Sequence, residues 1–300
     1  MASASVKHTV RESFGDRIFL TAVYVFLTLV LIATLYPLVF IVSSSFSSPA
    51  AVSGGRVWLL PVEAGLQGYA AAFKNSQIVT GYANSLFYTA AGTLISVTLT
   101  VMIAYPLSRK TFFGRSGLMM FIVFTMLFSG GLIPTYLVVK AVGLIDTRWA
   151  LLLPNAIWVW QVIIARTFFA TSIPDELAEA SEIDGCSDLR FISSVVLPLS
   201  KPILAVLMLM YAVGQWNAYF DALIYLKTNS LFPLQLFLRS ILILNNDTGT
   251  IDAGQIAEKQ MLQALMKYSI IVISSLPVLI IYPFVQRFFV QGMLIGSVKG

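Results

Sequence analysis

The sequence predicts an all-α polytopic membrane protein with six transmembrane helices. Hydrophobic residues make up 58% of the 300-residue chain and charged residues 11%, whereas soluble domains contain about 45–50% and about 25%. Six runs are apolar enough to cross a bilayer, which takes about 20 residues each. The single cysteine excludes a disulfide scaffold, and the 21 Phe, 12 Tyr and 5 Trp exclude a disordered chain. We expect one membrane domain over residues 1–300.

The six predicted spans are separated by segments rich in polar residues, glycine and proline. They cover Ile18–Val42, Tyr82–Leu107, Leu118–Val139, Trp149–Phe169, Leu199–Leu226 and Tyr268–Phe289. The five later spans form the predicted core of the domain, over about residues 82–290. An even number of spans places both termini on the same side of the membrane.

Lysine and arginine predict which side that is. Eleven of the 19 lie at the termini, in the segments that share their side, or at the span ends that face that side. They are Lys7, Arg11, Arg17, Arg109, Lys110, Arg115, Arg166, Arg190, Lys201, Arg287 and Lys299. Because cytoplasmic loops are enriched in these residues, we expect both termini in the cytoplasm. The same bias accounts for the net charge of +5, so we expect no nucleic-acid partner.

A polar segment, residues 171–200, separates the fourth and fifth predicted spans on the cytoplasmic side. Ser172 and Asp175 fit the capping box of a helix whose first turn contains Pro174. Gly185 is placed to end that helix. The sequence therefore predicts a short polar helix that ends in a sharp turn.

A second short helix is predicted to follow. It begins at Ser187 and ends at Leu197–Pro198, and Pro202 marks the start of the next span. One interpretation of the two helices is a simple solvated connector. However, helices of a bundle are usually joined by about 2–8 residues. We therefore expect so long a structured segment to contact another molecule.

The spacing within this segment resembles the EAA loop of permease subunits of ATP-binding-cassette (ABC) importers. Glu179–Ala180–Ser181 is followed by Gly185 six residues after Glu179, and then by Leu197–Pro198. Ser181 stands where that family usually has a second alanine, and Cys186 stands where sugar importers often have alanine. Both replacements are small residues, so the resemblance is preserved.

Other segments resemble the carbohydrate, maltose-type branch of this family. They are Asn84–Leu86, Ala104–Arg109, Phe113–Arg115, Ile133–Tyr136, Gly143–Thr147, Val285–Gly292 and Gly296–Gly300. Ser129–Pro134 is similar to the polysaccharide subgroup, which imports pectin-derived and alginate-derived oligosaccharides. These motifs cover nearly the whole chain in the family's order.

The resemblance implies a type I ABC importer permease that moves an oligosaccharide, in this subgroup an acidic one, into a bacterium. It implies multi-pass insertion in the cytoplasmic membrane beside a second homologous permease subunit. It also implies two cytoplasmic ABC ATPase subunits and an extracytoplasmic sugar-binding protein. A role in coupling to the ATPase is implied for Glu179, Ala180, Ser181, Asp184, Gly185, Leu197 and Pro198.

ATP and Mg²⁺ are expected on the partner ATPase. No glycine in this chain is followed by lysine, so the phosphate-binding loop Gly-x-x-x-x-Gly-Lys-Ser/Thr is absent. We therefore expect no cofactor bound by this chain.

Polar and aromatic residues inside the spans are candidates for the sugar path, because polar groups within membranes are costly and mark pathways. Gly214, Asn217 and Asp221 share one helical face if the fifth span is continuous. The candidates are Tyr88, Trp158, Gln161, Trp216, Asn217, Tyr219 and Asp221. Alternative roles are helix packing for the stripe containing Tyr88, interfacial anchoring for Trp158, and contact with the partner permease for Asn217 and Asp221.

Two other classes are a membrane-embedded enzyme and a channel without an ATPase partner. An enzyme would need clustered carboxylates, paired histidines, or a base beside a nucleophile within the spans. The chain contains a single histidine, His8, and a single cysteine, Cys186, so no zinc site or Ser-His-Asp triad is expected. A channel would leave the cytoplasmic helices without a role. We therefore expect a transporter subunit with no metal site.

Overall fold

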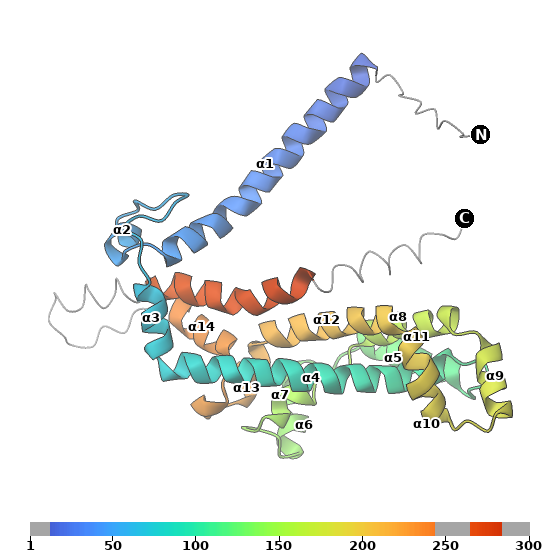
Figure 1. Cartoon of the computed structure of the whole chain (residues 1–300). Coiled ribbons are helices and arrows are strands. Elements are labelled where there is room, and N and C mark those ends of the chain that lie inside the picture. The colour runs from blue at the N-terminus through green and yellow to red at the C-terminus, as the bar shows by residue number, and fades with distance from the viewer. Residues whose placement is uncertain (1–12, 244–264, 284–300) are drawn as a thin grey trace. The chain divides into compact units, whose positions relative to one another are not determined.

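The computed structural model describes residues 13–243 and 265–283, and every regular element in these ranges is helical (Figure 1). The chain divides into two compact units, each described by itself below. Among the described residues, the first contains residues 13–70 and 265–272, and the second contains 71–243 and 273–283. The expectation of one domain over 1–300 stays a prediction.

The first unit is dominated by α1 (Phe14–Ser45), a 32-residue helix that contains the first predicted span. Asp16 accepts a hydrogen bond from the backbone N–H of Ser13 at 3.0 Å and so caps the first turn. None of the residues in its most apolar 18-residue window is buried within the chain. α1 is therefore free to present an apolar surface to lipid or to another subunit.

Serines at the end of α1 hold the following segment. The Ser43 hydroxyl donates to the Leu59 carbonyl at 2.6 Å, and Ser47 Oγ accepts from the Val62 N–H at 3.1 Å. Two short helices, α2 (Pro49–Ser53) and α3 (Gln67–Lys74), follow. Residues 43–62, which follow the first predicted span, are therefore folded back on themselves and hydrogen-bonded.

The second unit is built around α4 (Ser76–Ser108), which contains the second predicted span. α8 (Val159–Ser172) and α12 (Lys201–Asn217) both pack against it (Figure 1). Phe169, Leu207 and Tyr211 are fully buried in the core between these helices. The hydroxyls of Thr100 and Tyr211 lie 2.7 Å apart, so the tyrosine's polar end is satisfied inside this apolar core.

In the described part of the chain, three helices are long and apolar enough to cross a membrane: α1, α4 and the helix Leu265–Pro283. The count rises to five if two sharply bent helix pairs are each taken as one span. The last helix covers most of the sixth predicted span, and residues 284–289 of that span lie outside the described residues. Six spans are therefore not confirmed as continuous helices.

The third and fourth predicted spans are wrong as continuous helices. α5 (Arg115–Leu127) and α6 (Leu132–Ala141) meet at 114°. α5 ends at an extended Phe128, and Gly131, with a positive φ of 82°, redirects the chain into α6. The fourth prediction covers α7 (Trp149–Leu152) and α8, with a turn between them. Pro154 lies in that turn and lacks the N–H that helix continuation requires.

The fifth predicted span is also interrupted. α12 ends at Asn217, and α13 (Phe220–Tyr225) begins after an extended Ala218. Asp221 therefore does not continue the α12 face that carries Gly214 and Asn217, and the prediction of one shared face is wrong. A short 3₁₀ turn (Asn229–Leu231, η2) and then α14 (Leu234–Ile243) follow.

The segment predicted to be cytoplasmic contains α9 (Asp175–Ile183), α10 (Asp188–Phe191), a π-helical turn η1 (Ile192–Val196) and α11 (Leu197–Leu199). The predicted capping box is wrong: Ser172 is the last residue of α8, and Pro174 is the N-cap of α9. Leu197–Pro198 does not end the second helix, which continues to Leu199. The π-turn precedes Pro198, whose ring would clash with a carbonyl of a regular α-helix.

Candidate functional site: a cytoplasmic helix surface and a cavity within the helices

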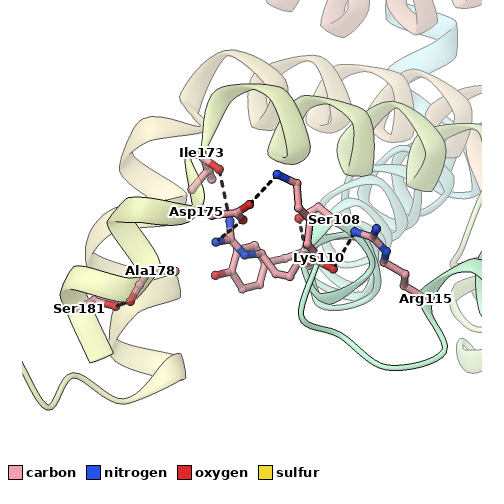
Figure 2. A network of polar contacts seen from close by, with 9 residues as sticks. Ser108, Lys110, Arg115, Ile173, Asp175, Ala178 and Ser181 are labelled. Atoms are coloured by element: carbon pink, nitrogen blue, oxygen red, sulfur yellow. Dashed lines mark hydrogen bonds and ion pairs between the residues drawn. The ribbon is translucent and has the colours of Figure 1, made fainter. Parts of the chain in front are cut away.

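The start of α9 is held against the end of α4 by charge. Arg109 Nη2 lies 2.9 Å from Asp175 Oδ1, and Lys110 Nζ lies 3.1 Å from Asp175 Oδ2 (Figure 2). Arg109 also donates to the Ile173 carbonyl at 3.3 Å. The Arg109 side chain is 11% exposed and that of Lys110 is 78% exposed, so the arginine makes the better shielded contact.

Two further basic side chains donate hydrogen bonds to carbonyl groups at the end of α4. Arg115 donates to the Arg109 carbonyl at 3.3 Å, and Arg166 donates to the Leu107 carbonyl at 3.1 Å. Figure 2 shows Arg115, Lys110 and Asp175 gathered at this end of the helix. Cations near the last carbonyls of a helix complement its dipole. Arg109 and Lys110 therefore hold the start of α9, whereas Arg115 and Arg166 bond carbonyl groups at the end of α4.

Gly185 ends α9 as predicted. Its φ of 69° is left-handed, and its N–H donates to the Glu182 carbonyl at 3.0 Å. The next N–H, of Cys186, donates to the Ser181 carbonyl at 2.9 Å. These two bonds form a Schellman motif. Cys186 packs against the core of the second unit, so the turn is joined to the helix bundle.

The free face of α9 carries both acidic and apolar groups. Glu179, Ala180 and Asp184 are exposed, and Ile183 is 87% exposed. Leu189 on α10 adds a second apolar side chain, 81% exposed. The Ser181 hydroxyl donates to the Ala178 carbonyl at 2.7 Å, within the helix itself. The surface therefore contains exposed apolar side chains beside carboxylates, a composition suited to contact with a protein partner.

Behind this face lie Leu197 and Pro198, the last two residues predicted to couple the chain to the ATPase. Leu197 is half-buried and packs against the hydrophobic core, while Pro198 is exposed. They connect the cytoplasmic helices to α12, which is bent by 85° from the preceding helical segment. A displacement of α9 and α10 is thereby linked by the chain to α12.

A cavity of about 150 Å³ lies within the second unit, far from α9. It brings together three of the seven predicted path residues: Tyr88, Trp158 and Asp221. Gly214 lines it too, as does Gln215, which sequence reasoning missed. The 21 residues from Tyr88 to Arg109 along α4 correspond to about 30 Å of helix.

Asn155 is a second cavity residue that sequence reasoning missed, and it donates to Asp221 Oδ2 at 2.7 Å. It belongs to the turn that interrupts the fourth predicted span, so a continuous helix gave no signal for it. Trp158 is fixed beside the cavity. Its backbone N–H donates to the Tyr211 hydroxyl at 3.2 Å, and its indole ring packs against Gly214. A Cβ at Gly214 would lie 2.8 Å from Trp158 Cζ2. The cavity therefore has one rigid aromatic wall and one carboxamide–carboxylate pair.

The other four predicted path residues lie elsewhere. Gln161 is buried in α8, and the Trp216 indole donates to the Ser274 carbonyl at 2.9 Å. Asn217 donates within its own helix to the Val213 carbonyl at 2.8 Å. The Tyr219 ring lies under the guanidinium of Arg239, whose Cζ is 5.6 Å from the ring centroid. The structure therefore does not bring these four to the cavity.

Segment 230–234 is fixed to α4 by Asn84 and by Tyr88, the latter a member of the predicted stripe. Asn84 donates to the Ser230 and Phe232 carbonyls at 2.7 and 3.1 Å, and the Tyr88 hydroxyl donates to the Leu231 carbonyl at 2.8 Å. Tyr88 thus both supports this segment and lines the cavity. The packing alternative for this stripe describes most of what the side chains do.

A second group of hydrogen bonds, the polar clamp around Asp146, joins the segment before α7 to the segment after α13. Asp146, which has a φ of 60°, accepts hydrogen bonds from the Thr228 hydroxyl at 2.7 Å and from the Lys227 and Thr228 N–H groups at 2.8 and 2.9 Å. These bonds, the Thr228 hydroxyl first, hold the pKa of Asp146 below its ordinary value. The Asp146 N–H in turn donates to the Tyr225 carbonyl at 2.8 Å.

Comparison with known proteins identifies the family, although no protein-family model matches the chain. Protein LplC of Bacillus subtilis is 40% identical over 293 residues, which cover 98% of this chain and 99% of that protein. The polygalacturonan/rhamnogalacturonan transport system permease protein YtcP of the same organism is 40% identical over 289 residues, 95% and 99% of the two chains. A chain in the crystal structure of a bacterial ABC transporter involved in the import of the acidic polysaccharide alginate is 36% identical, with a TM-score of 0.87. The match covers 94% of this chain and 100% of that one.

Helices of membrane-spanning length, together with these similarities, define a membrane transport protein. The chain belongs to the permease subunits of ABC transporters. The resemblance stated from the EAA spacing and the accompanying motifs is thereby confirmed, as is the expectation of a transporter subunit rather than an enzyme. Permeases of ABC importers work with ATPase and binding-protein partners, so this chain acts within an assembly.

Proposed function

We propose that this chain is a permease subunit of an ATP-driven importer that moves an acidic oligosaccharide into the bacterial cytoplasm. The named relatives transport polygalacturonan or rhamnogalacturonan, and alginate, all of which carry carboxylated sugars. The alternatives of a membrane-embedded enzyme or an independent channel do not fit these relatives. ATP and Mg²⁺ bind a separate ATPase, and this chain binds no cofactor itself.

One observation carries the proposal: an exposed helix surface and an internal cavity lie on the same packed helices about 30 Å apart. α9 is anchored to the end of α4 by the Arg109–Asp175 ion pair, whereas the cavity lies between α4, α12 and α13. ATP changes such a transporter only by binding its two conformations with different affinity. Displacement of α9 by the ATPase would move α4 and α12, and so reshape the cavity.

The coupling residues act at the ATPase surface. Glu179 pairs with a basic residue of the ATPase, and Ala180 permits close approach where a larger side chain would clash. Ser181, Asp184 and Gly185 shape the end of α9. Leu197 and Pro198 transmit its displacement to α12. Ile183, an exposed apolar side chain on this helix, becomes buried on docking.

The cavity residues contact the oligosaccharide. Tyr88 and Trp158 offer rings to the C–H faces of a sugar, and Asp221 with Asn155 offers hydrogen bonds to its hydroxyls. We retain Gln161, Trp216, Asn217 and Tyr219 as path residues of the assembled pair of permeases. A second permease subunit could complete a path that this chain lines on one side.

The assembly contains a second homologous permease, two ATPase subunits and an extracytoplasmic sugar-binding protein. The chain lies in the bacterial cytoplasmic membrane as a multi-pass protein, with both termini in the cytoplasm. Six passages are the number that the sequence pattern favours. The bent pair of α5 and α6 and the interrupted segment of α7 and α8 then contribute one passage each.

The experiment is ATP hydrolysis by the purified transporter, reconstituted with its binding protein and an oligogalacturonate. Glu179→Lys and Gly185→Pro should abolish the hydrolysis that the loaded binding protein stimulates, while membrane insertion remains normal. Glu182→Lys, the same charge change at another exposed site of α9, is the matched control and should retain stimulation. Normal stimulated hydrolysis in both the Glu179 and Gly185 variants would refute docking through this helix.

A further inference from the structure

A second cavity, of about 410 Å³, lies beside α13 and α14. Its polar lining residues are Gln77, Asn229, Arg239 and Ser240, and its apolar ones are Leu223, Phe232, Leu236 and Phe237. Ligand sites typically enclose about 300–1,000 Å³, with a few polar groups among apolar side chains. This cavity has that size and composition, whereas the 150 Å³ cavity on the Asp221 side is smaller.

Arg239 gives this cavity a positive charge with which no carboxylate of residues 13–243 or 265–283 forms an ion pair. The ion pairs among the described residues are Arg56–Glu63, Arg109–Asp175 and Lys110–Asp175, so none of their carboxylates neutralises Arg239. Its guanidinium rests on the ring of Tyr219, which limits its rotamers. A restrained guanidinium fork matches the two oxygens of a carboxylate.

The platform that carries Arg239 is tightly packed. α14 lies on α4 so closely that a Cβ at Gly81 would be 2.7 Å from Phe237 Cδ2. The first N–H of α14, from Leu234, donates to the Ser85 hydroxyl at 2.8 Å. Rigid support of this kind keeps a binding side chain in place before the ligand arrives.

The third large cavity does not compete for a sugar. Its volume is about 620 Å³, and its lining is apolar apart from Thr89 and Thr93. It lies between α4, α12 and the helix Leu265–Pro283. An apolar space among membrane helices offers few partners for the hydroxyl and carboxylate groups of an acidic sugar.

We propose that the cavity containing Arg239 binds the carboxylate of a uronic acid unit in the transported oligosaccharide. Arg239 pairs with the carboxylate, Gln77, Asn229 and Ser240 bond the hydroxyls, and the two phenylalanines contact the C–H face. Asp221, on α13, lines the 150 Å³ cavity and not this one, and it repels a carboxylate and favours hydroxyl groups on its own side. This inference rests on the proposed function and adds the chemical feature that this chain recognises.

The test compares uptake of trigalacturonate with uptake of its methyl ester, which has the same sugar backbone without charge. The full transporter and its binding protein are reconstituted in vesicles, and the acid-to-ester uptake ratio is measured for each variant. The binding protein's own preference cancels when a variant's ratio is divided by that of the wild type. Arg239→Gln should lower the ratio by about tenfold, the loss of one hydrogen bond to a charged group.

Arg148→Gln is the matched control, because Arg148 already stacks on Phe87, with Cζ 4.5 Å from the ring centroid, and lies outside this cavity. Its acid-to-ester ratio should equal that of the wild type. Equal loss of acid and ester uptake in Arg239→Gln would overturn the inference, because it would indicate a structural role or a contact with the binding protein. Uptake of only the ester by the wild-type transporter would also overturn the inference, although import of a sugar would then still be observed. ATP-dependent uptake of neither compound by the wild type would overturn the proposed acidic-oligosaccharide function itself.

Discussion

Loss of the Asp175 carboxylate should release α9 from the end of α4. The Arg109 contact, 2.9 Å long with the arginine side chain 11% exposed, lies between a surface pair and a buried pair. Breaking a buried pair costs about 3–5 kcal/mol and a surface pair about 0–1. We therefore expect Asp175→Ala to destabilise this attachment by about 2 kcal/mol. Lys110→Ala, at a side chain that is 78% exposed, should cost about 0.5 kcal/mol or less.

The labelling rate of a cysteine thiol can measure this release of α9. Cys186, its single cysteine, is partly buried at the turn after α9, so a thiol reagent reads local opening. When closing is fast, the labelling rate follows the population of the open form. Asp175→Ala should then raise the rate by about 30-fold and Lys110→Ala by about twofold or less. Labelling in denaturant should be equal in all variants, which controls for the intrinsic reactivity of the thiol.

Equal acceleration of labelling in the two variants would refute this prediction, because the difference in shielding between Arg109 and Lys110 would then have no energetic effect. An unchanged rate in Asp175→Ala would refute it as well, since α9 would then be held by apolar contacts alone. A double-mutant cycle between Arg109→Ala and Asp175→Ala should give a coupling free energy larger than that between Lys110→Ala and Asp175→Ala.

Three further predictions concern the cavity, the polar clamp and the turn after α9. Gly214→Ala should displace the Trp158 ring and destabilise the protein by about 1–3 kcal/mol, measured by thermal unfolding in detergent; a shift of zero would mean that the ring moves freely. Because the pKa of Asp146 is lowered in the folded chain, its contribution to stability is present above about pH 4 and is lost as the pH falls through the lowered value. Asp146→Asn should therefore show a smaller decrease in unfolding temperature below pH 4 than the wild type, and an equal decrease would contradict the clamp. Gly185→Ala should cost about 1–2 kcal/mol for its left-handed φ, seen as faster Cys186 labelling, and an unchanged rate would show that the turn relaxes.

The sequence predicts the helical class, the helices of the first two spans and the helices of segment 171–200 well, because each has a strong local signal. Long apolar runs identify α1 and α4, and the EAA spacing identifies α9 with its terminal Gly185. Hydropathy fails where backbone geometry interrupts an apolar run. Gly131 and Pro154 lie inside runs that are apolar enough to count as single spans, so composition gave no reason to divide them there.

The candidate path was predictable only in part, because its geometry depends on the break after Asn217. A continuous helix would place Asn217 and Asp221 together, but the extended Ala218 separates them and Asp221 bonds Asn155 instead. Asn155 lies in a turn where the sequence predicts a helix. Arg239 lies on α14, in the segment between the fifth and sixth predicted spans, which was expected to be a loop. Contacts between residues distant in the sequence are not visible in periodicity.

The break between α5 and α6 has a consequence for how lipid can surround this chain. A helix end leaves four N–H or four C=O groups without intrahelical partners, so a break creates both sets at once. α5 and α6 have 13 and 10 residues, about 20 and 15 Å of helix, and neither alone equals the roughly 30 Å of a hydrocarbon layer. Acyl chains offer those peptide groups no hydrogen bonds. At Phe128–Gly131 the boundary of the protein must therefore meet water, headgroups or another polypeptide, and a continuous shell of lipid tails cannot close around it.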